Sequence, residues 1–192
     1  MRKVLAIIAV LTLFLSAATS GMAAQKLIPV SATIQGTSQL NVGISKVDAT
    51  TQVWTAGQSS IAFGTLTFDT TNSIFTAANY YVVDVGVVNN TGAWTLSVGA
   101  TSITNGTANL DNNINVTVVE QVNSSTEGAT LDKISYGASN GKSYSSASIA
   151  AGSWIRLYYG IATGLADNPG VTPIGTSKPA GSYSGTITLT LA

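Results

Sequence analysis

The sequence predicts an all-β fold, a sandwich or barrel of short strands, on the basis of three observations. Apolar and polar residues alternate with a period of two along most of the chain after residue 24, as in strands that bury one face. No stretch of that region has the spacing of an amphipathic helix. Clusters of Gly, Asn, Asp and Pro separate the alternating runs and are typical of turns. No linker divides the region, so residues 25–192 are predicted to form one domain.

The first 24 residues have the pattern of a secretory signal peptide. Met1-Arg2-Lys3 is basic, residues 4–15 are apolar, and small residues dominate residues 16–24. Cleavage is predicted after Ala23 or Ala24. The apolar run is shorter than the roughly 20 residues that a helix needs to span a membrane, and no later segment is long enough. The protein is therefore predicted to be secreted, through a periplasm to the cell surface or the medium, with no membrane span in the mature chain.

Alternation predicts three strands in the first part of the mature chain. The first lies in residues 25–35 and is separated by Gly36 from a second across residues 40–44. The third is predicted across residues 61–68, with a β-bulge at Gly64 because the apolar residues change face there. The apolar face of the first strand consists of Ile28, Val30, Ala32 and Ile34, and that of the second consists of Leu40, Val42 and Ile44.

The rest of the chain continues the same pattern. Residues 80–88 and 93–98 are predicted to pair as a β-hairpin across the turn residues 89–92, with Trp94 in the core. The remaining predictions are strands at residues 114–118, 155–161 and 183–191, weaker strand patterns in residues 123–150, and a loop rich in Pro and Gly at residues 164–179.

Composition excludes several classes of partner. The 192 residues include 8 basic and 8 acidic ones, and cleavage of the leader removes the basic residues Arg2 and Lys3. Such a chain has no polybasic surface for nucleic acid or for an anionic membrane. It has no Cys, so its stability comes from packing and backbone hydrogen bonds. A surface of Thr, Ser, Asn and Gly with so little charge favours packing against copies of the same chain.

Two residue types that often carry catalysis, His and Cys, are missing from the sequence. The absence of His and Cys excludes the most common general base, thiolate nucleophiles and the usual zinc sites. Asp69-Thr70-Thr71 is typical of a turn, and Glu120 and Glu127 are typical of a solvated surface. Residues 111–115 offer oxygen ligands for calcium, but an Asx turn accounts for them better. We therefore predict no enzyme activity, no cofactor and no metal site.

One aromatic cluster is a candidate contact patch. Trp154, Arg156 and Tyr158 fall on one face of the strand predicted around residues 155–161, opposite its apolar face. Arg156 lies between the two aromatic residues, an arrangement suited to cation–π contacts. One interpretation is a patch that stacks on sugars or contacts another subunit. The other is ordinary packing of an outer face beneath a loop.

The alternating segment at residues 25–35 also has two interpretations. Pro29 has no N–H to donate and favours the edge or the start of a strand. The segment is either the first strand of its own sheet or a strand donated to the open sheet of a neighbouring copy. Donation joins subunits head to tail, so the assembly grows as a fibre. In that case Ile28, Val30, Ala32 and Ile34 form the buried face of the donor strand.

Several stretches together resemble a known kind of protein. The leader, the alternating segment and Ile61-Ala62-Phe63-Gly64 are accompanied by VGVVNNTGAWTLSV at residues 85–98 and PAGSYSGTITLTL at residues 179–191. This pattern resembles secreted immunoglobulin-like sandwich proteins, in particular fimbrial subunits of the spore-coat-U type and WxL-type cell-surface domains. The resemblance implies a single immunoglobulin-like, pilin-like β-sandwich that polymerises through a donated strand, with a periplasmic chaperone as a partner.

These observations lead to two expected functions. The first is a structural subunit of an extracellular fibre, pilus or surface layer, built from copies of this chain by β-strand addition. The second is a module that binds cell-surface carbohydrate or cell wall, with surface glycans as its partners.

Overall fold

The computed structural model describes residues 31–192 and is nearly all β, with 48% of residues in strands and 2% in helix. The all-β sandwich predicted from the sequence is confirmed. The compact unit is Gly36–Ala192, whereas residues 31–35 belong to a separate unit and have no regular secondary structure. The predicted leader, residues 1–24, lies outside the described residues.

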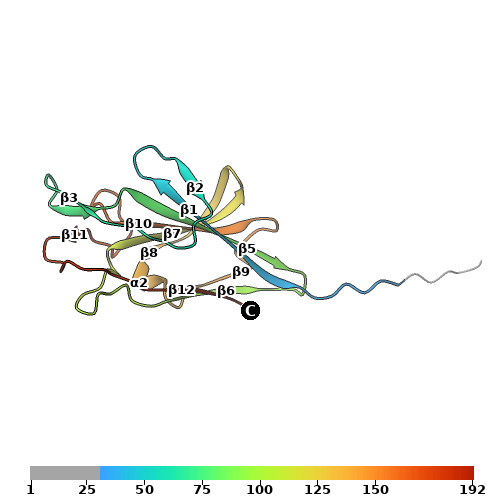
Figure 1. The fold of residues 1–192 in the computed structure, drawn as a ribbon. Coiled ribbons are helices and arrows are strands. Elements are labelled where there is room, and N and C mark those ends of the chain that lie inside the picture. Colours follow the sequence, from blue (N-terminus) through green and yellow to red (C-terminus); the bar gives the residue numbers. More distant parts are fainter. Residues whose placement is uncertain (1–30) are drawn as a thin grey trace, which may run out of the picture. The chain divides into compact units, whose positions relative to one another are not determined.

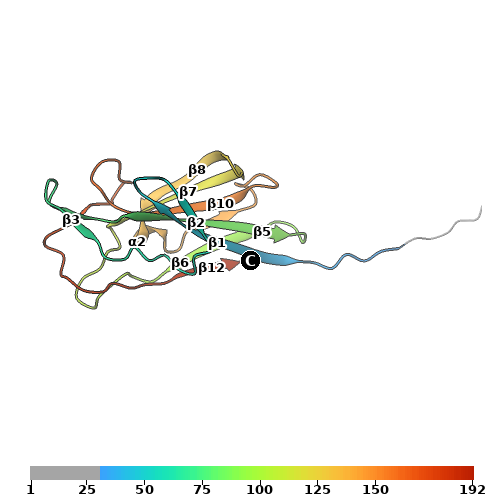
Figure 2. The same cartoon turned by 45° about the horizontal axis from the view of Figure 1, so that its top comes forward.

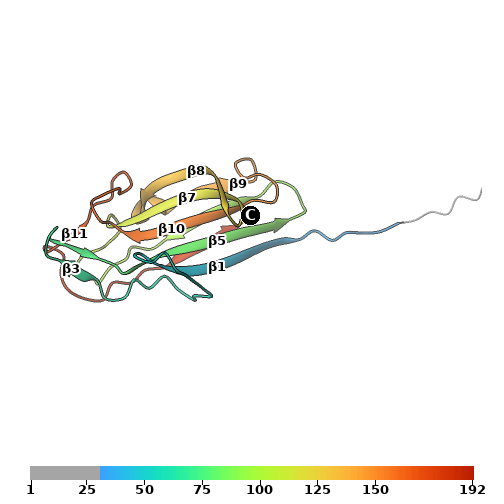
Figure 3. The ribbon, with the colours of Figure 1, turned by 90° about the horizontal axis from the view of Figure 1, so that it is seen from above.

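Six antiparallel strands form the larger sheet, whose order is easiest to follow in Figure 3. That order is β2 (Trp54–Ala56), β1 (Ser38–Asp48), β5 (Asn79–Asn89), β10 (Trp154–Ile161), β7 (Ile114–Asn123) and β8 (Thr126–Ser135). β1 pairs with β5 along its whole length, from Ser38 opposite Asn89 to Asp48 opposite Asn79. Four of the predicted strands therefore lie side by side in this sheet, as β1, β5, β7 and β10.

A three-stranded sheet packs against one face of the larger sheet, which we call the inner face (Figure 1). Its order is β12 (Ile187–Leu191), β6 (Thr95–Ala100) and β9 (Ser143–Ser145). The hydrophobic core lies between the two sheets, because alternate residues of every strand point to the same side. Its most deeply buried side chains include Val85, Leu96, Val98, Val116, Val118, Ile155 and Leu157.

Short elements complete the compact unit. A small sheet of β11 (Ile174–Gly175), β4 (Ile74–Thr76) and β3 (Thr67–Asp69) lies at one end of the molecule in Figure 1. The single turn of helix α2 (Tyr136–Ser139) buries Tyr136, whose hydroxyl donates to the carbonyl oxygens of Thr101 and Thr186. Within residues 31–192, no helix is long and apolar enough to cross a bilayer.

The predicted hairpin between residues 80–88 and 93–98 is wrong. β5 belongs to the six-stranded sheet, but β6 pairs with β12 and β9 in the other one. The chain crosses from one sheet to the other at residues 90–94, with Gly92 at φ +129°. Turn residues fix a local change of direction but not which sheet the next strand joins. Trp94, predicted in the core, packs against it but remains half-buried.

The strand predicted at residues 61–68 is also largely wrong. Only its last part forms a strand, β3, and residues 61–66 are irregular. Gly64 has φ +70°, a left-handed conformation that breaks the extended backbone at the position where a bulge was predicted. Ile61 and Phe63 still pack against the core, and the Ala62 carbonyl accepts a hydrogen bond from Tyr81 Oη at 2.6 Å instead of a ladder bond.

Residues 123–150 contain more structure than their weak alternation predicts. β8 is a ten-residue strand at the edge of the sheet, and its first half is exposed. Because that half buries neither face, its sequence does not alternate between apolar and polar residues. At residues 164–179 the predicted loop is present, interrupted only by the two residues of β11. Residues 183–191 form a strand only from Ile187, as β12.

Candidate functional site

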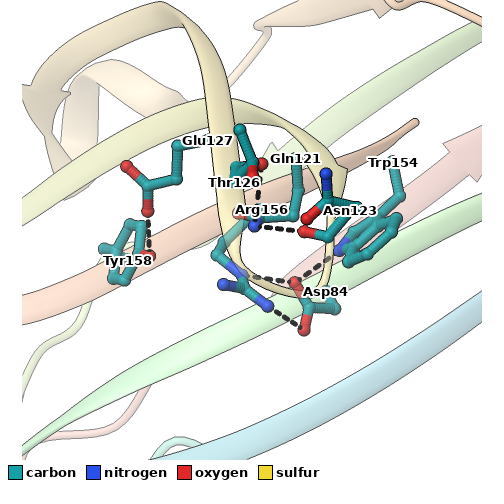
Figure 4. Close-up of polar contacts among 8 residues, drawn as sticks. All are labelled: Asp84, Gln121, Asn123, Thr126, Glu127, Trp154, Arg156 and Tyr158. Carbon is teal, nitrogen blue, oxygen red and sulfur yellow. Dashed lines mark hydrogen bonds and ion pairs between the residues drawn. The ribbon is translucent and has the colours of Figure 1, made fainter.

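The outer face of the six-stranded sheet carries a cluster centred on Asp84 of β5 and Arg156 of β10 (Figure 4). The two residues are direct partners in the register of these strands, so their side chains leave the sheet side by side. Arg156 Nε lies 2.7 Å from Asp84 Oδ1, and its Nη2 lies 2.9 Å from Oδ2. This bidentate geometry is the strongest form of an arginine–carboxylate pair.

Two tryptophans enclose the ion pair. Trp154 donates its Nε1–H to Asp84 Oδ1 at 2.9 Å, as Figure 4 shows. The ring of Trp54, from the edge strand β2, lies 5.2 Å from the Arg156 guanidinium carbon, within cation–π range. Arg156 is only 9% exposed. Its pKa is raised above the ordinary value, chiefly by the hydrogen bond to Asp84, so the guanidinium stays charged.

Tyr158 extends the cluster along β10. Its hydroxyl donates to Glu127 of β8, and its ring lies 6.5 Å from that of Tyr80. Burial, and then the hydrogen bond to Glu127, raise the pKa of Tyr158 to about 12. Like Arg156, Tyr158 therefore uses its polar group within its own chain.

Gln121 of β7 closes the cluster on the side of β8. It is 1% exposed, and its Nε2 donates to the carbonyl oxygens of Asn123, at 2.6 Å, and Thr126, at 3.1 Å. These two carbonyls belong to the turn between β7 and β8, so the amide fixes the shape of that turn (Figure 4). Within the described chain, Gln121 Oε1 has no hydrogen-bond partner.

A shallow depression of about 570 Å³ lies next to Trp154. Gly43 of β1 and Gly86 of β5 line it together with Asn41 and Asp84. A Cβ built on Gly43 meets nothing within 4 Å, so the space above this glycine is open. The depression therefore combines an indole, a carboxylate, an amide and a flat backbone surface.

The structure brings the three patch residues together as the sequence predicted. Trp154, Arg156 and Tyr158 leave the same face of β10, with Arg156 in the middle. Sequence reasoning missed their partners Asp84, Trp54 and Glu127, which come from three other strands. Of these three partners, only Asp84 stands out in the sequence, because it is a single charged residue within an apolar strand. That the patch contacts another molecule remains a prediction.

The four predicted donor residues fall into two groups. Ile28 and Val30 lie outside the described residues. Ala32 and Ile34 are described, and neither belongs to a strand. Ile34 is 85% exposed, one of the highest values for a large apolar residue in residues 31–192. The first strand of the compact unit is β1, which begins at Ser38.

The weak catalytic candidates have structural partners instead. Asp69 Oδ1 accepts the Thr71 N–H at 2.8 Å, so the Asp69-Thr70-Thr71 sequence is a turn, and hydrogen bonds from Asn72 and Thr71 lower the pKa of Asp69. Glu120 accepts the Ala150 N–H, whereas Glu127 binds Tyr158. Among residues 31–192, no group of acidic side chains is arranged to hold a metal ion.

Comparison with protein-family models, curated proteins and solved structures finds no significant match to this chain. A functional assignment therefore rests on geometry and chemistry. The cluster around Asp84 uses its polar groups within the chain and leaves part of the Trp54 ring exposed.

Proposed function

We propose that the protein is a structural subunit of an extracellular fibre or surface layer, whose copies join by β-strand addition. The observation that carries this proposal is the exposure of the segment before Gly36. Its alternating apolar residues match a strand with one buried face, yet Ile34 is 85% exposed and residues 31–37 form no strand. Burying such a side chain contributes roughly 2 kcal/mol, which a neighbouring copy supplies when it accepts the segment as a strand.

The surface chemistry supports the same proposal. The chain has only 8 acidic and 8 basic residues, so copies approach each other with little electrostatic repulsion. In β12, the exposed residues Thr188 and Thr190 are small and uncharged, and they pack readily against another strand. A periplasmic chaperone is the expected partner of the free subunit, because an unpaired apolar segment aggregates unless it is covered.

Deletion of residues 25–35 tests the proposal. Protein produced from the full chain is expected to form filaments or large oligomers in size-exclusion chromatography and negative-stain microscopy. The deletion is expected to give folded monomers, with an unchanged circular dichroism spectrum. Ile34→Asp is expected to act like the deletion, whereas Thr33→Asp, on the opposite face of the segment, retains assembly. Assembly of the deleted protein, or monomers from the full chain, contradicts strand addition through this segment.

The depression beside Trp154 favours carbohydrate binding as a second candidate function. Indole rings stack on sugars, and the neighbouring Asn41 and Asp84 offer polar atoms to hydroxyl groups. If this function holds, the monomer binds insoluble wall polysaccharide, and Trp154→Ala weakens binding. Trp94→Phe, in the segment that precedes β6, serves as the control and retains binding. Equal retention on the polysaccharide by both variants contradicts the site.

A further inference from the structure

We propose that the depression beside Trp154 binds a flat, uncharged glycan ribbon, and that Gly43 of β1 and Gly86 of β5 form the floor on which its sugar rings lie. Such a ribbon is the shape of a β-1,4-linked chain of glucose-type sugars, whose ring substituents are all equatorial. This inference rests on carbohydrate binding, the second candidate function, and adds to it the class of glycan and the residues that select it.

The two glycines lie within paired strands and on the same face of the sheet. Gly43 pairs with Asp84, and Gly86 pairs with Asn41. Residues directly opposite each other share a face, so both glycines lie on the outer face together with Asp84. β1 and β5 run side by side in Figure 2, and residues of both line the depression. At these two positions the sheet contributes only backbone to its surface.

Within residues 31–192, nothing in the fold requires glycine at either position. Neither residue has a left-handed φ, the conformation that glycine usually serves. A Cβ built on Gly86 has its nearest neighbours at 3.8 Å, an ordinary contact, and one built on Gly43 meets nothing within 4 Å. Glycine inside a strand weakens it, and it often marks a place where a ligand or another backbone comes close. A ligand that needs an empty floor therefore explains the pair.

The side chains around the floor suit a sugar ring. Trp154 is held by the bond of 2.9 Å from its Nε1–H to Asp84, as Figure 4 shows, so its indole forms a rigid wall. Asn41 and Ser153 also line the depression and offer polar groups to hydroxyls. Asn41 Oδ1 accepts a hydrogen bond from Gln39 at 3.2 Å, and its amide N–H groups are left for a ligand within the described residues. Apolar surface with a few polar groups is the usual composition of a small-ligand site.

The charges at the site indicate that the ligand is uncharged. Within the described chain, Asp84 is the one charged residue that lines the depression. Its carboxylate already pairs with the buried Arg156, at 2.7 Å and 2.9 Å. A charged ligand would therefore leave water without gaining a counter-charge, which costs free energy. Glycans that carry carboxylate or phosphate groups are poorer ligands for this reason.

The shape of the floor favours sugars with equatorial substituents. The depression is shallow and ends on the backbone of two neighbouring strands. A sugar ring reaches this floor only when no substituent points down from it. In β-1,4-linked chains of glucose or N-acetylglucosamine the substituents point outwards from the ring, whereas an α-linked glucose chain coils and has axial bonds. Cellulose and chitin are therefore the expected kind of ligand, and starch is not.

Filling the floor tests the proposal. Gly43→Thr places a β-branched side chain where the space is open, so it is expected to raise the urea midpoint of unfolding. The same variant is expected to bind microcrystalline cellulose and chitin about tenfold more weakly than the unchanged protein in pull-down assays. Gly99→Ala, in β6 of the other sheet, is the control and is expected to retain binding. A variant that is more stable and binds more weakly distinguishes a ligand site from a structural role.

The outcomes separate this inference from the candidate function on which it rests. Binding of Gly43→Thr equal to that of the unchanged protein overturns the floor, and it leaves carbohydrate binding in place when Trp154→Ala weakens binding. Equal binding to starch and to cellulose overturns the selection of flat glycans. Absence of binding to all three polysaccharides overturns carbohydrate binding itself, and this inference with it. A lower unfolding midpoint in Gly43→Thr would show that the fold requires the glycine, and it too would overturn the inference.

Discussion

Asp84 is the only charged residue in the eleven residues of β5, and Arg156 explains its position. The carboxylate accepts two hydrogen bonds from the guanidinium and one from Trp154, so it is well solvated by protein groups. A buried ion pair adds little net stability compared with an apolar pair of similar size, but loss of one partner leaves an uncompensated charge. The pair therefore favours the observed register, in which Asp84 of β5 lies opposite Arg156 of β10.

Asp84→Ala is expected to lower the free energy of unfolding by about 2 kcal/mol. The value lies below that for a fully buried pair because the Asp84 side chain is 34% exposed. Urea unfolding followed by tryptophan fluorescence measures it. The double variant Asp84→Leu with Arg156→Leu is the control, and it is expected to be more stable than Asp84→Ala, because no charge is left unpaired. A double variant less stable than the single one would contradict this account.

Tyr158 gives the stability a dependence on alkaline pH. Its pKa is raised from 10.0 to about 12 by burial and by the hydrogen bond to Glu127. A group whose pKa is higher in the folded state stabilises the fold below its unfolded pKa, and this contribution is lost as the pH rises through the folded value. The free energy of unfolding is therefore expected to fall between pH 10 and 12, less steeply in Tyr158→Phe. Urea titrations across this range measure the difference, and equal slopes would exclude the assigned role.

Among the elements, the strands whose one face is fully buried were predictable from the sequence. β5, β7 and β10 show recognisable alternation because one set of alternate residues in each strand enters the core. β8 lies in residues 123–150, where only weaker strand patterns were predicted, because its exposed edge position does not require an apolar face. The connection from β5 to β6 was assigned wrongly, since pairing between strands depends on contacts distant in sequence. The Asp84 cluster was missed in part for the same reason.

The turn between β7 and β8 depends on one buried amide. Gln121→Leu removes the amide that donates to both the Asn123 and the Thr126 carbonyl oxygen. The expected loss is about 1–2 kcal/mol of unfolding free energy, with faster amide hydrogen exchange confined to the ends of β7 and β8. Val122→Leu, at an exposed position near the end of β7, is the control. Uniformly faster exchange across both sheets would show that Gln121 supports the core instead.

At the scale of the whole molecule, the two layers of the sandwich are unequal. The six-stranded sheet packs against a sheet of only three strands. Beside β12, at the edge of the smaller sheet, apolar inner-face residues therefore stay in contact with solvent, and we call this the open side of the sandwich. Composition predicted a self-associating surface, but the location of the open side depends on sheet order. Sheet order is a tertiary property that alternation does not encode.

Two valines at matched positions test the importance of the open side. Val42 on the inner face of β1 is 47% exposed, and Val88 on the outer face of β5 is 48% exposed. Val42→Lys and Val88→Lys are each expected to change the free energy of unfolding by less than about 0.5 kcal/mol, because both positions are accessible to water. Only Val42→Lys is expected to abolish filaments in negative-stain microscopy. Loss of assembly in both variants, or in neither, would contradict a role for the open side in assembly.

The continuous register of β1 with β5 has a mechanical consequence for an assembly joined through the segment before Ser38. Tension on that segment enters the compact unit at the first residue of β1. The strand is paired with β5 from Ser38 to Asp48 without a break. When the pull runs along the strand, the ladder hydrogen bonds are loaded in shear and share the force, instead of rupturing one after another from an end. Each subunit would then resist stretching through the longest uninterrupted pairing in its fold.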